Sequence, residues 1–145
     1  MKAVEIKKTG GPEVLELKDI KLADPSNGEV LIKQVAIGLN YIDTYHRSGL
    51  YPVPLPSGIG LEGAGIIEKV GSDTDGFNVG DKVCYAAAPI GSYATHRIYP
   101  TKSLVKVPDE IDLEIVAAIM TKGLTTFYLL HKTYIAKSGE TVLFH

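Results

Sequence analysis

Glycine and proline divide the first hundred or so residues of this chain into short apolar runs. The 145 residues include 15 glycines and 8 prolines, and many of the runs between them have the composition of β-strands. Many short strands separated by turns are typical of a barrel or a sandwich. The predicted strands are residues 3–6, 14–22, 30–37, 64–70, 82–85, 92–99 and 104–107.

The character of the sequence changes after Pro108. Asp109 or Asp112 can cap a helix that residues 114–120 continue. The remaining chain predicts a second helix over 124–134, a turn at 137–140 and a buried strand at 141–144. The predicted fold class is therefore mainly β with α (α+β).

Composition excludes several classes of partner. A 45% apolar and 22% charged chain with a net charge of −2 is ordinary for a globular protein, and no basic cluster indicates nucleic acid. The amino terminus lacks the apolar core of a signal peptide, and no window approaches the length of a membrane span. The one cysteine, Cys84, excludes an internal disulfide and favours a reducing compartment. We expect a cytoplasmic protein with no membrane or nucleic-acid partner.

A polar and aromatic segment, residues 38–52, follows the apolar run 30–37. It holds an amide, a carboxylate, three phenols and two hydroxyls. A polar loop that leaves the end of a buried strand is a common way to build a small-molecule site. A surface loop whose tyrosines cover the core has the same pattern, so residue spacing favours neither interpretation.

Five ordered motifs carry a family resemblance: GGPEVLEL, GLNYIDTYHRSGLYP, GLEGAGIIEKVG, GDKV and KGLTTFYLLHKTY. Together they resemble the amino-terminal part of the quinone oxidoreductase (zeta-crystallin-like) branch of the zinc-independent medium-chain dehydrogenase/reductase superfamily. The resemblance implies a GroES-like, partly open β-barrel over residues 1–111. It implies linking helices and the first strand of a truncated Rossmann domain over 112–145. It also implies NADPH as cofactor, a quinone substrate, and a homodimer formed mainly through the missing domain.

The resemblance also assigns site residues. In the family, the segment matching 41–45 and the threonine of Lys-Gly-Leu-Thr lie beside the nicotinamide. The expected cofactor-binding residues are Tyr41, Ile42, Asp43, Thr44, Tyr45 and Thr125. The expected catalytic residues are Asn40, Asp43, Tyr45 and Tyr51. The Asn40 amide and the two tyrosine hydroxyls can donate hydrogen bonds to a developing oxyanion. Asp43 either orients neighbouring groups or stabilises a turn.

No metal site is predicted. Related zinc enzymes place a cysteine and a histidine where this chain has Asn40 and Leu61, and neither residue replaces a thiolate or an imidazole as a zinc ligand. The four histidines show no ligand spacing and are predicted to be solvated or hydrogen-bonded. A quinone or activated enone is already electrophilic and needs less help from a metal than an alcohol does.

The pattern G-x-G-x-x-G at residues 58–63 is a weak signal for a phosphate site. Prolines rather than a strand precede it, and a β-like run rather than a helix follows it, so we interpret it as a loop that feeds a strand. Glu62 within it either bridges to a basic residue beneath the site or caps the loop, and we favour structural support. Lys122 lies near the predicted break between the two helices, where it can meet a cofactor phosphate or stay solvated, and we favour the solvated lysine. Cys84 is predicted to be buried.

No complete dinucleotide-binding fold is therefore expected, and the chain by itself should bind NADPH poorly. Either this is a fragment or the product of a split gene, which we favour, or it is a naturally short, non-catalytic barrel that binds a ligand or a protein. A fragment of an enoyl reductase is a further alternative. The choice between NADPH and NADH stays open, because the residues that read the ribose lie outside the sequence.

Overall fold

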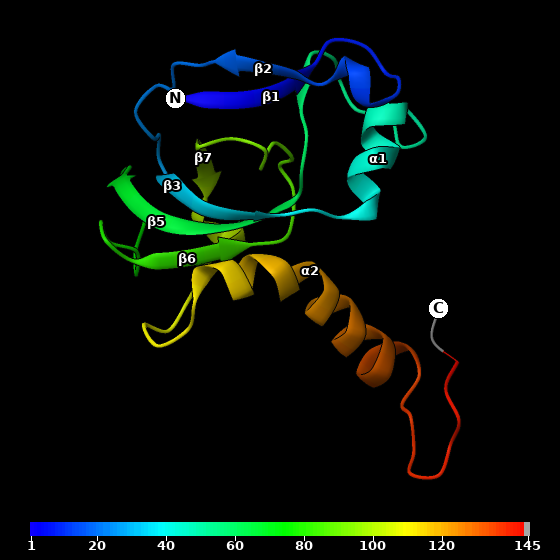
Figure 1. Cartoon of the computed structure of the whole chain (residues 1–145). Helices are drawn as coiled ribbons and strands as arrows, with labels where there is room; N and C mark the ends of the chain where they lie inside the picture. The colour runs from blue at the N-terminus through cyan, green and yellow to red at the C-terminus, as the bar shows by residue number, and fades with distance from the viewer. Residues whose placement is uncertain (144–145) are drawn as a thin grey trace.

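The computed structural model describes residues 1–143 and contains two antiparallel sheets (Figure 1). The smaller sheet has the strand order β2-β1-β4, with bounds β1 Lys2–Ile6, β2 Glu16–Asp19 and β4 Ser57–Gly58. The larger has the order β7-β3-β5-β6-β8, with bounds β3 Glu29–Gly38, β5 Glu62–Val70, β6 Lys82–Tyr85, β7 His96–Pro100 and β8 Val105–Lys106. Helical segments are η1 Pro12–Val14, α1 Tyr41–Ser48, η2 Thr101–Ser103, α2 Leu113–Tyr128 and η3 Leu129–Thr133. The predicted class, mainly β with α, is confirmed.

The segment just before β7 joins the two sheets. The Tyr93 carbonyl accepts from Val4 N–H at 2.7 Å, and the Thr95 carbonyl accepts from Gln34 N–H at 3.0 Å. Because Val4 lies on β1 and Gln34 on β3, one short segment closes part of a barrel. Its interior is an apolar cluster of Val30, Ile32, Ile67, Val83, Tyr85, Tyr99 and Leu104.

Several predicted strands are shorter than expected. The alternating run 14–22 forms β2 only over Glu16–Asp19, preceded by the short helix η1. The run 92–99 forms β7 only from His96, because residues 93–95 bond to both sheets instead. The stretch 104–107 keeps two paired residues in β8. Local alternation marks these segments correctly, but their lengths follow from which neighbours they meet.

Two predictions about helices are wrong. Residues 41–48 form the helix α1 rather than a loop, since Asn40 stands at its N-cap and Gly49 ends it in the left-handed region at φ 86°. Residues 113–128 form one continuous helix rather than two, because a glycine inside a helix costs only about 1 kcal/mol. Asp112, not Asp109, caps this helix and accepts from Glu114 N–H at 2.7 Å.

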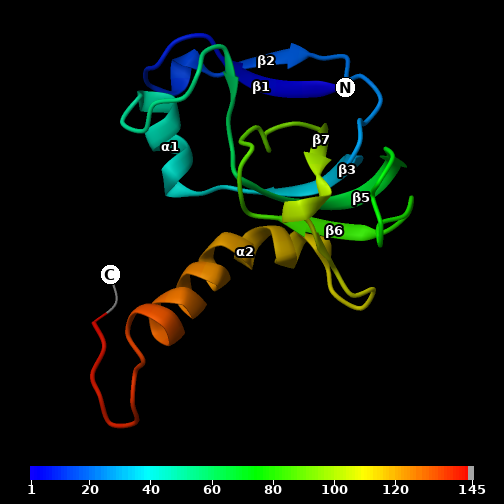
Figure 2. The same cartoon turned by 180° about the vertical axis from the view of Figure 1, so that it is seen from behind.

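The first two turns of α2 pack on the larger sheet, and the rest projects away from it (Figures 1 and 2). Leu113, Val116 and Ala117 are buried with Cys84 of β6. Helix α2 together with η3, residues Leu113–Thr133, is 21 residues long and contains an 18-residue window with a mean hydropathy of 1.4, so its length and composition are sufficient to span a membrane. This corrects the expectation that no window approaches that length. One such helix is weak support for a membrane partner, because the core helix of a soluble protein can have the same length and composition.

The predicted strand at 141–144 is not observed over residues 141–143, which form no strand and are exposed. A strand needs a neighbour for its backbone hydrogen bonds, and no other strand lies beside this segment in the part of the chain that is described. Residue 144, the predicted end of this strand, lies outside the described residues.

Candidate functional site

The amino terminus of α1 is held by its own polar residues. Strand β3 ends at Gly38, and Asn40 takes an extended conformation before the helix begins. The carboxylate of Asp43 accepts from Asn40 N–H at 3.0 Å, which satisfies a backbone donor at the start of the helix. Both side chains are almost fully buried, at 8% and 3% exposure. Asp43 therefore stabilises the start of the helix through a local backbone hydrogen bond.

The buried carboxylate of Glu62 connects this helix end to α2. Glu62 is fully buried at the first position of β5. Its Oε2 accepts from Asn40 Nδ2 at 2.6 Å, and its Oε1 accepts from the Thr121 backbone N–H at 2.8 Å. A buried carboxylate is tolerated only with such partners. The predicted structural support is confirmed, and the carboxylate also touches a predicted catalytic residue.

Lys122 of α2 completes the cluster. Its Nζ donates to Asn40 Oδ1 at 3.2 Å and lies 3.9 Å from Glu62 Oε2. The side chain keeps 58% of its surface exposed, so it is solvated, as predicted, and paired as well. The sequence offered no signal for this contact, because the residues are 82 positions apart.

Gly38 allows α2 to approach this cluster. A Cβ at Gly38 would collide with the Ala117 carbonyl and with the Glu62 carboxylate. Any other residue at this position would push α2 away from the end of β3, and the contact between Thr121 and Glu62 would open. The glycine at the end of β3 therefore sets the spacing of the site.

Tyr93 supports Asp43 from the segment that joins the two sheets. Its hydroxyl donates to Asp43 Oδ2 at 2.9 Å. Burial raises the pKa of Tyr93 well above its ordinary value, and the hydrogen bond to the Asp43 carboxylate raises it further. The tyrosine therefore stays a hydrogen-bond donor at physiological pH. Sequence reasoning missed this residue, because only tertiary contacts bring it to α1.

Three tyrosines form an aromatic cluster on the surface of α1 and just beyond it. The Tyr45 ring lies 5.5 Å from that of Tyr41 and 5.2 Å from that of Tyr51, measured between centroids. Tyr41 is 77% and Tyr51 48% exposed. The predicted catalytic residues thus form two groups: buried Asn40 and Asp43 at the start of α1, and the packed rings of half-buried Tyr45 and exposed Tyr51.

The remaining predicted cofactor residues lie on α1 and α2. Ile42 and Thr44 are half-buried in α1, where the Thr44 hydroxyl donates to the Tyr41 carbonyl at 2.7 Å. Thr125 is exposed on α2, and its hydroxyl donates to the Thr121 carbonyl at 2.7 Å. Each hydroxyl oxygen keeps the capacity to accept a hydrogen bond from a ligand.

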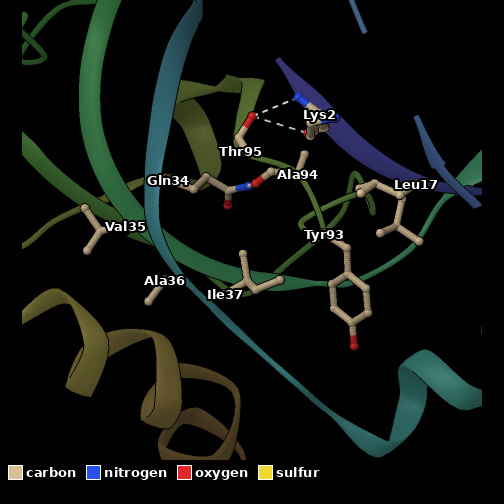
Figure 3. A pocket seen from close by; sticks show the side chains of 10 residues that line it. Lys2, Leu17, Gln34, Val35, Ala36, Ile37, Tyr93, Ala94 and Thr95 are labelled. Carbon is tan, nitrogen blue, oxygen red and sulfur yellow. Dashed lines mark hydrogen bonds between the residues drawn. The ribbon is translucent and has the colours of Figure 1, made fainter. Parts of the chain in front are cut away.

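Two cavities share the Tyr93 side chain. The smaller, about 100 Å³, is lined by Leu15, Leu39, Asn40, Asp43, Thr44, Arg47, Ile59 and Tyr93. The larger, about 430 Å³, lies between β1 and the last residues of β3, with Val35, Ile37 and Tyr93 around it (Figure 3). None of the predicted site residues lines the larger cavity. Three of the predicted site residues, Asn40, Asp43 and Thr44, line the smaller cavity.

The histidine prediction needs one correction. His46 is buried in α1 and its Nδ1 has no hydrogen-bond partner within the described residues, and its ring lies edge-on to that of Tyr51 at a centroid distance of 6.2 Å. His96 contacts Thr95 and Glu68, and His131 is exposed, whereas His145 lies outside the described residues. Across residues 1–143, no three His, Cys, Asp or Glu side chains gather in a way that could hold a metal ion.

The comparison with known families agrees with this geometry. Residues 26–109 match the alcohol dehydrogenase GroES-like domain. The chain belongs to this family. A quinone oxidoreductase of Pseudomonas aeruginosa is 54% identical over 145 residues, covering 99% of this chain and 45% of that protein. A 2-haloacrylate reductase of a Burkholderia species is 42% identical over 150 residues, covering 99% and 45%.

A solved structure shows the same arrangement. The quinone oxidoreductase of Escherichia coli complexed with NADPH superposes with a TM-score of 0.94 and 45% identity, covering 97% of this chain and 43% of that one. The GroES-like chain thus spans less than half the length of the relatives it matches. The resemblance to the quinone oxidoreductase branch is confirmed.

Proposed function

We propose that this GroES-like chain is the substrate-side part of an NADPH-dependent quinone oxidoreductase. The observation that carries the proposal is the buried Asn40 amide, held by Glu62 at the start of the helix that carries half-buried Tyr45, whose ring packs on exposed Tyr51. The relatives named as quinone oxidoreductases support the choice of reaction. Because the chain spans less than half of their length, the activity belongs to the complete protein that carries these residues.

The residues present fit the nicotinamide end of NADPH. Tyr41 is exposed at the start of α1, and Thr125 lies one helical turn beyond Thr121, which Glu62 holds next to Asn40. The pyrophosphate end normally binds a glycine-rich turn that precedes a helix. Here the glycine-rich stretch 58–63 leads into β5 instead. We therefore expect the chain by itself to bind NADPH weakly.

NADPH, when bound, supplies a hydride. The chain's own groups then stabilise the negative charge that develops on the acceptor oxygen. The hydroxyls of Tyr45 and Tyr51 make no hydrogen bond within the described residues and are free to donate, and Asn40 keeps a second amide N–H. A donor of this kind is worth roughly 3–4 kcal/mol when it is aimed at the developing oxyanion.

Reduction of an activated alkene is a second candidate function. The similarity to a 2-haloacrylate reductase favours it. Such a substrate also develops negative charge on an oxygen when hydride adds to its carbon–carbon double bond, so the same donors would serve. The two candidates differ only in the acceptor that is reduced fastest.

We place the start of a second structural unit near residue 112. Its support is that β8, the last strand, ends at Lys106 and that Asp112 caps α2, which contacts the sheet through Leu113, Val116 and Ala117 and is exposed from Lys122 onward. We further propose a cytoplasmic protein whose dimer contacts lie mainly outside these residues. A buried free Cys84 is compatible with a reducing compartment.

Oxidation of NADPH by the complete protein tests the function. We expect turnover with 1,4-benzoquinone that exceeds turnover with 2-chloroacrylate, and we expect the 145-residue chain alone to bind NADPH at least 100-fold more weakly, roughly the loss of 3 kcal/mol. Absence of quinone turnover contradicts the proposal. Faster turnover of 2-chloroacrylate selects the second candidate, and micromolar NADPH affinity of the chain alone contradicts the placement of the pyrophosphate site.

A further inference from the structure

The structure assigns Glu62 and Lys122 as positioning residues that fix the direction of the Asn40 amide, so that Asn40 presents an N–H donor to the substrate. This inference rests on the proposed function. It adds two residues that act through Asn40 rather than on the substrate.

Only one orientation of the amide satisfies both neighbours. A carboxylate can only accept hydrogen bonds and an ammonium group can only donate them. Asn40 Nδ2 therefore faces Glu62 Oε2 at 2.6 Å, and Oδ1 faces Lys122 Nζ at 3.2 Å. With one N–H bound by the carboxylate, the other is left for a ligand.

The two neighbours are anchored from different elements. Glu62 is fully buried on β5 and is held by the Thr121 N–H at 2.8 Å. Lys122 follows Thr121 in α2, so the Asn40 amide is hydrogen-bonded to one residue of a strand and one residue of a helix. Its ammonium also lies 3.9 Å from Glu62 Oε2 and partly balances that buried charge. The amide direction therefore depends on how α2 docks on the sheet.

Exchanging the carboxylate and the amide between positions 40 and 62 distinguishes the role of Glu62 in orienting Asn40 from the role of Asn40 as a hydrogen-bond donor. Glu62→Gln leaves two amides in contact, and every choice of orientations produces one donor–donor pair with Asn40, Thr121 or Lys122. Asn40→Asp places two carboxylates side by side. The double variant Asn40→Asp/Glu62→Gln restores matched partners and the net charge, but position 40 then has no N–H to donate.

We expect each single variant of the complete protein to lower Tm by roughly 5–10 °C. The double variant should recover most of that loss, yet its kcat with benzoquinone should remain about 100-fold below wild type. Failure of the double variant to recover Tm contradicts the assigned directions of the hydrogen bonds between positions 40 and 62. Recovery of kcat together with Tm contradicts the donor role of Asn40.

Lys122 is tested by kcat and KM measured separately. Lys122→Met should lower kcat for the quinone about tenfold with little change in Tm, since the side chain is largely exposed. Lys122→Arg keeps the donor and should recover most of the rate. Unchanged kcat in Lys122→Met overturns the role of Lys122. If wild type reduces no quinone while the Tm coupling between positions 40 and 62 holds, the proposed function fails and the positioning by Glu62 stands.

Discussion

Tyr93 donates its hydroxyl hydrogen to Asp43 over 2.9 Å and so joins two residues that are 50 positions apart. The contact ties the segment that closes the barrel to the first turn of α1. The Oδ2 atom that Tyr93 contacts also accepts from Asn40 N–H. The segment that closes the barrel and the start of α1 are therefore connected through one shared acceptor atom, Asp43 Oδ2.

Removing the Tyr93 hydroxyl tests this connection. Tyr93→Phe keeps the ring but leaves the buried Asp43 carboxylate with one donor fewer, so the free energy of unfolding should fall by about 1–3 kcal/mol. Urea unfolding measures the change, and Tyr128→Phe is the control, because Tyr128 is 60% exposed. Equal stability of the two variants would show that the hydrogen bond contributes nothing.

Two glycines should respond to alanine in opposite directions. Gly38→Ala places a methyl group against the Ala117 carbonyl and the Glu62 carboxylate and should cost about 1–3 kcal/mol. Gly123→Ala lies inside α2 with nothing within 4 Å of the added Cβ, and it should stabilise by about 0.5–1 kcal/mol. Chemical denaturation of both variants is sufficient, and a stable Gly38→Ala protein would contradict the close approach of α2.

Buried tyrosines should make the fold sensitive to alkaline pH. Burial raises the pKa of Tyr85 to about 12, an effect that nearby Arg97 partly offsets. An unfolded tyrosine has a pKa of about 10, so the folded state keeps a proton that the unfolded state loses. The stabilisation is therefore complete below pH 10 and lost as pH rises toward 12.

We expect the free energy of unfolding to drop by about 1–3 kcal/mol over that interval. Tyr85→Phe cannot ionise, so its stability should fall less steeply between pH 10 and 12 than that of wild type. Urea titrations at several pH values measure both slopes. Identical slopes would show that Tyr85 does not carry the effect.

The single cysteine should be inert in the folded chain. Cys84 is 2% exposed beneath α2, and burial together with the negative charge of Glu62 raises its pKa to about 11. A thiol of this kind should not react with Ellman's reagent at pH 8 until the chain unfolds. Val79→Cys adds a thiol at a 61% exposed position and should react at once. Rapid reaction of wild type would contradict the packing of α2.

The Tyr45 hydroxyl has no partner within the described residues, although its ring packs at 5.2 Å from that of Tyr51. Tyr45→Phe preserves the packing and removes a donor, so kcat of the complete protein with benzoquinone should fall about tenfold or more. Steady-state kinetics measure it, with the exposed Tyr134→Phe as control. A rate equal to that of the control would remove Tyr45 from the catalytic group.

Local sequence predicted the elements whose causes are local. Strands 64–70 and 82–85 are recovered nearly residue for residue, because apolar runs between turn residues need only a neighbour to pair with. The helix at 41–48 was missed although Asn40, Asp43 and Gly49 are ordinary helix-end residues. The aromatic and polar composition of residues 38–52 is typical of a loop and favours that interpretation instead. The two helices predicted on either side of Gly123 are one continuous helix, because a single weak helix former does not end a helix.

By itself, the sequence determined the strand-rich class, the segment around residues 38–52 as the place to look for a site, and the family to which the chain belongs. Only the tertiary structure decided that Glu62, Tyr93 and Lys122 converge on Asn40 and Asp43. The physical reason is the separation along the chain over which each interaction acts. Turns, helix caps and strand alternation depend on residues only a few positions apart. A buried carboxylate, in contrast, takes its partners from whichever strands and helices the packing brings to it.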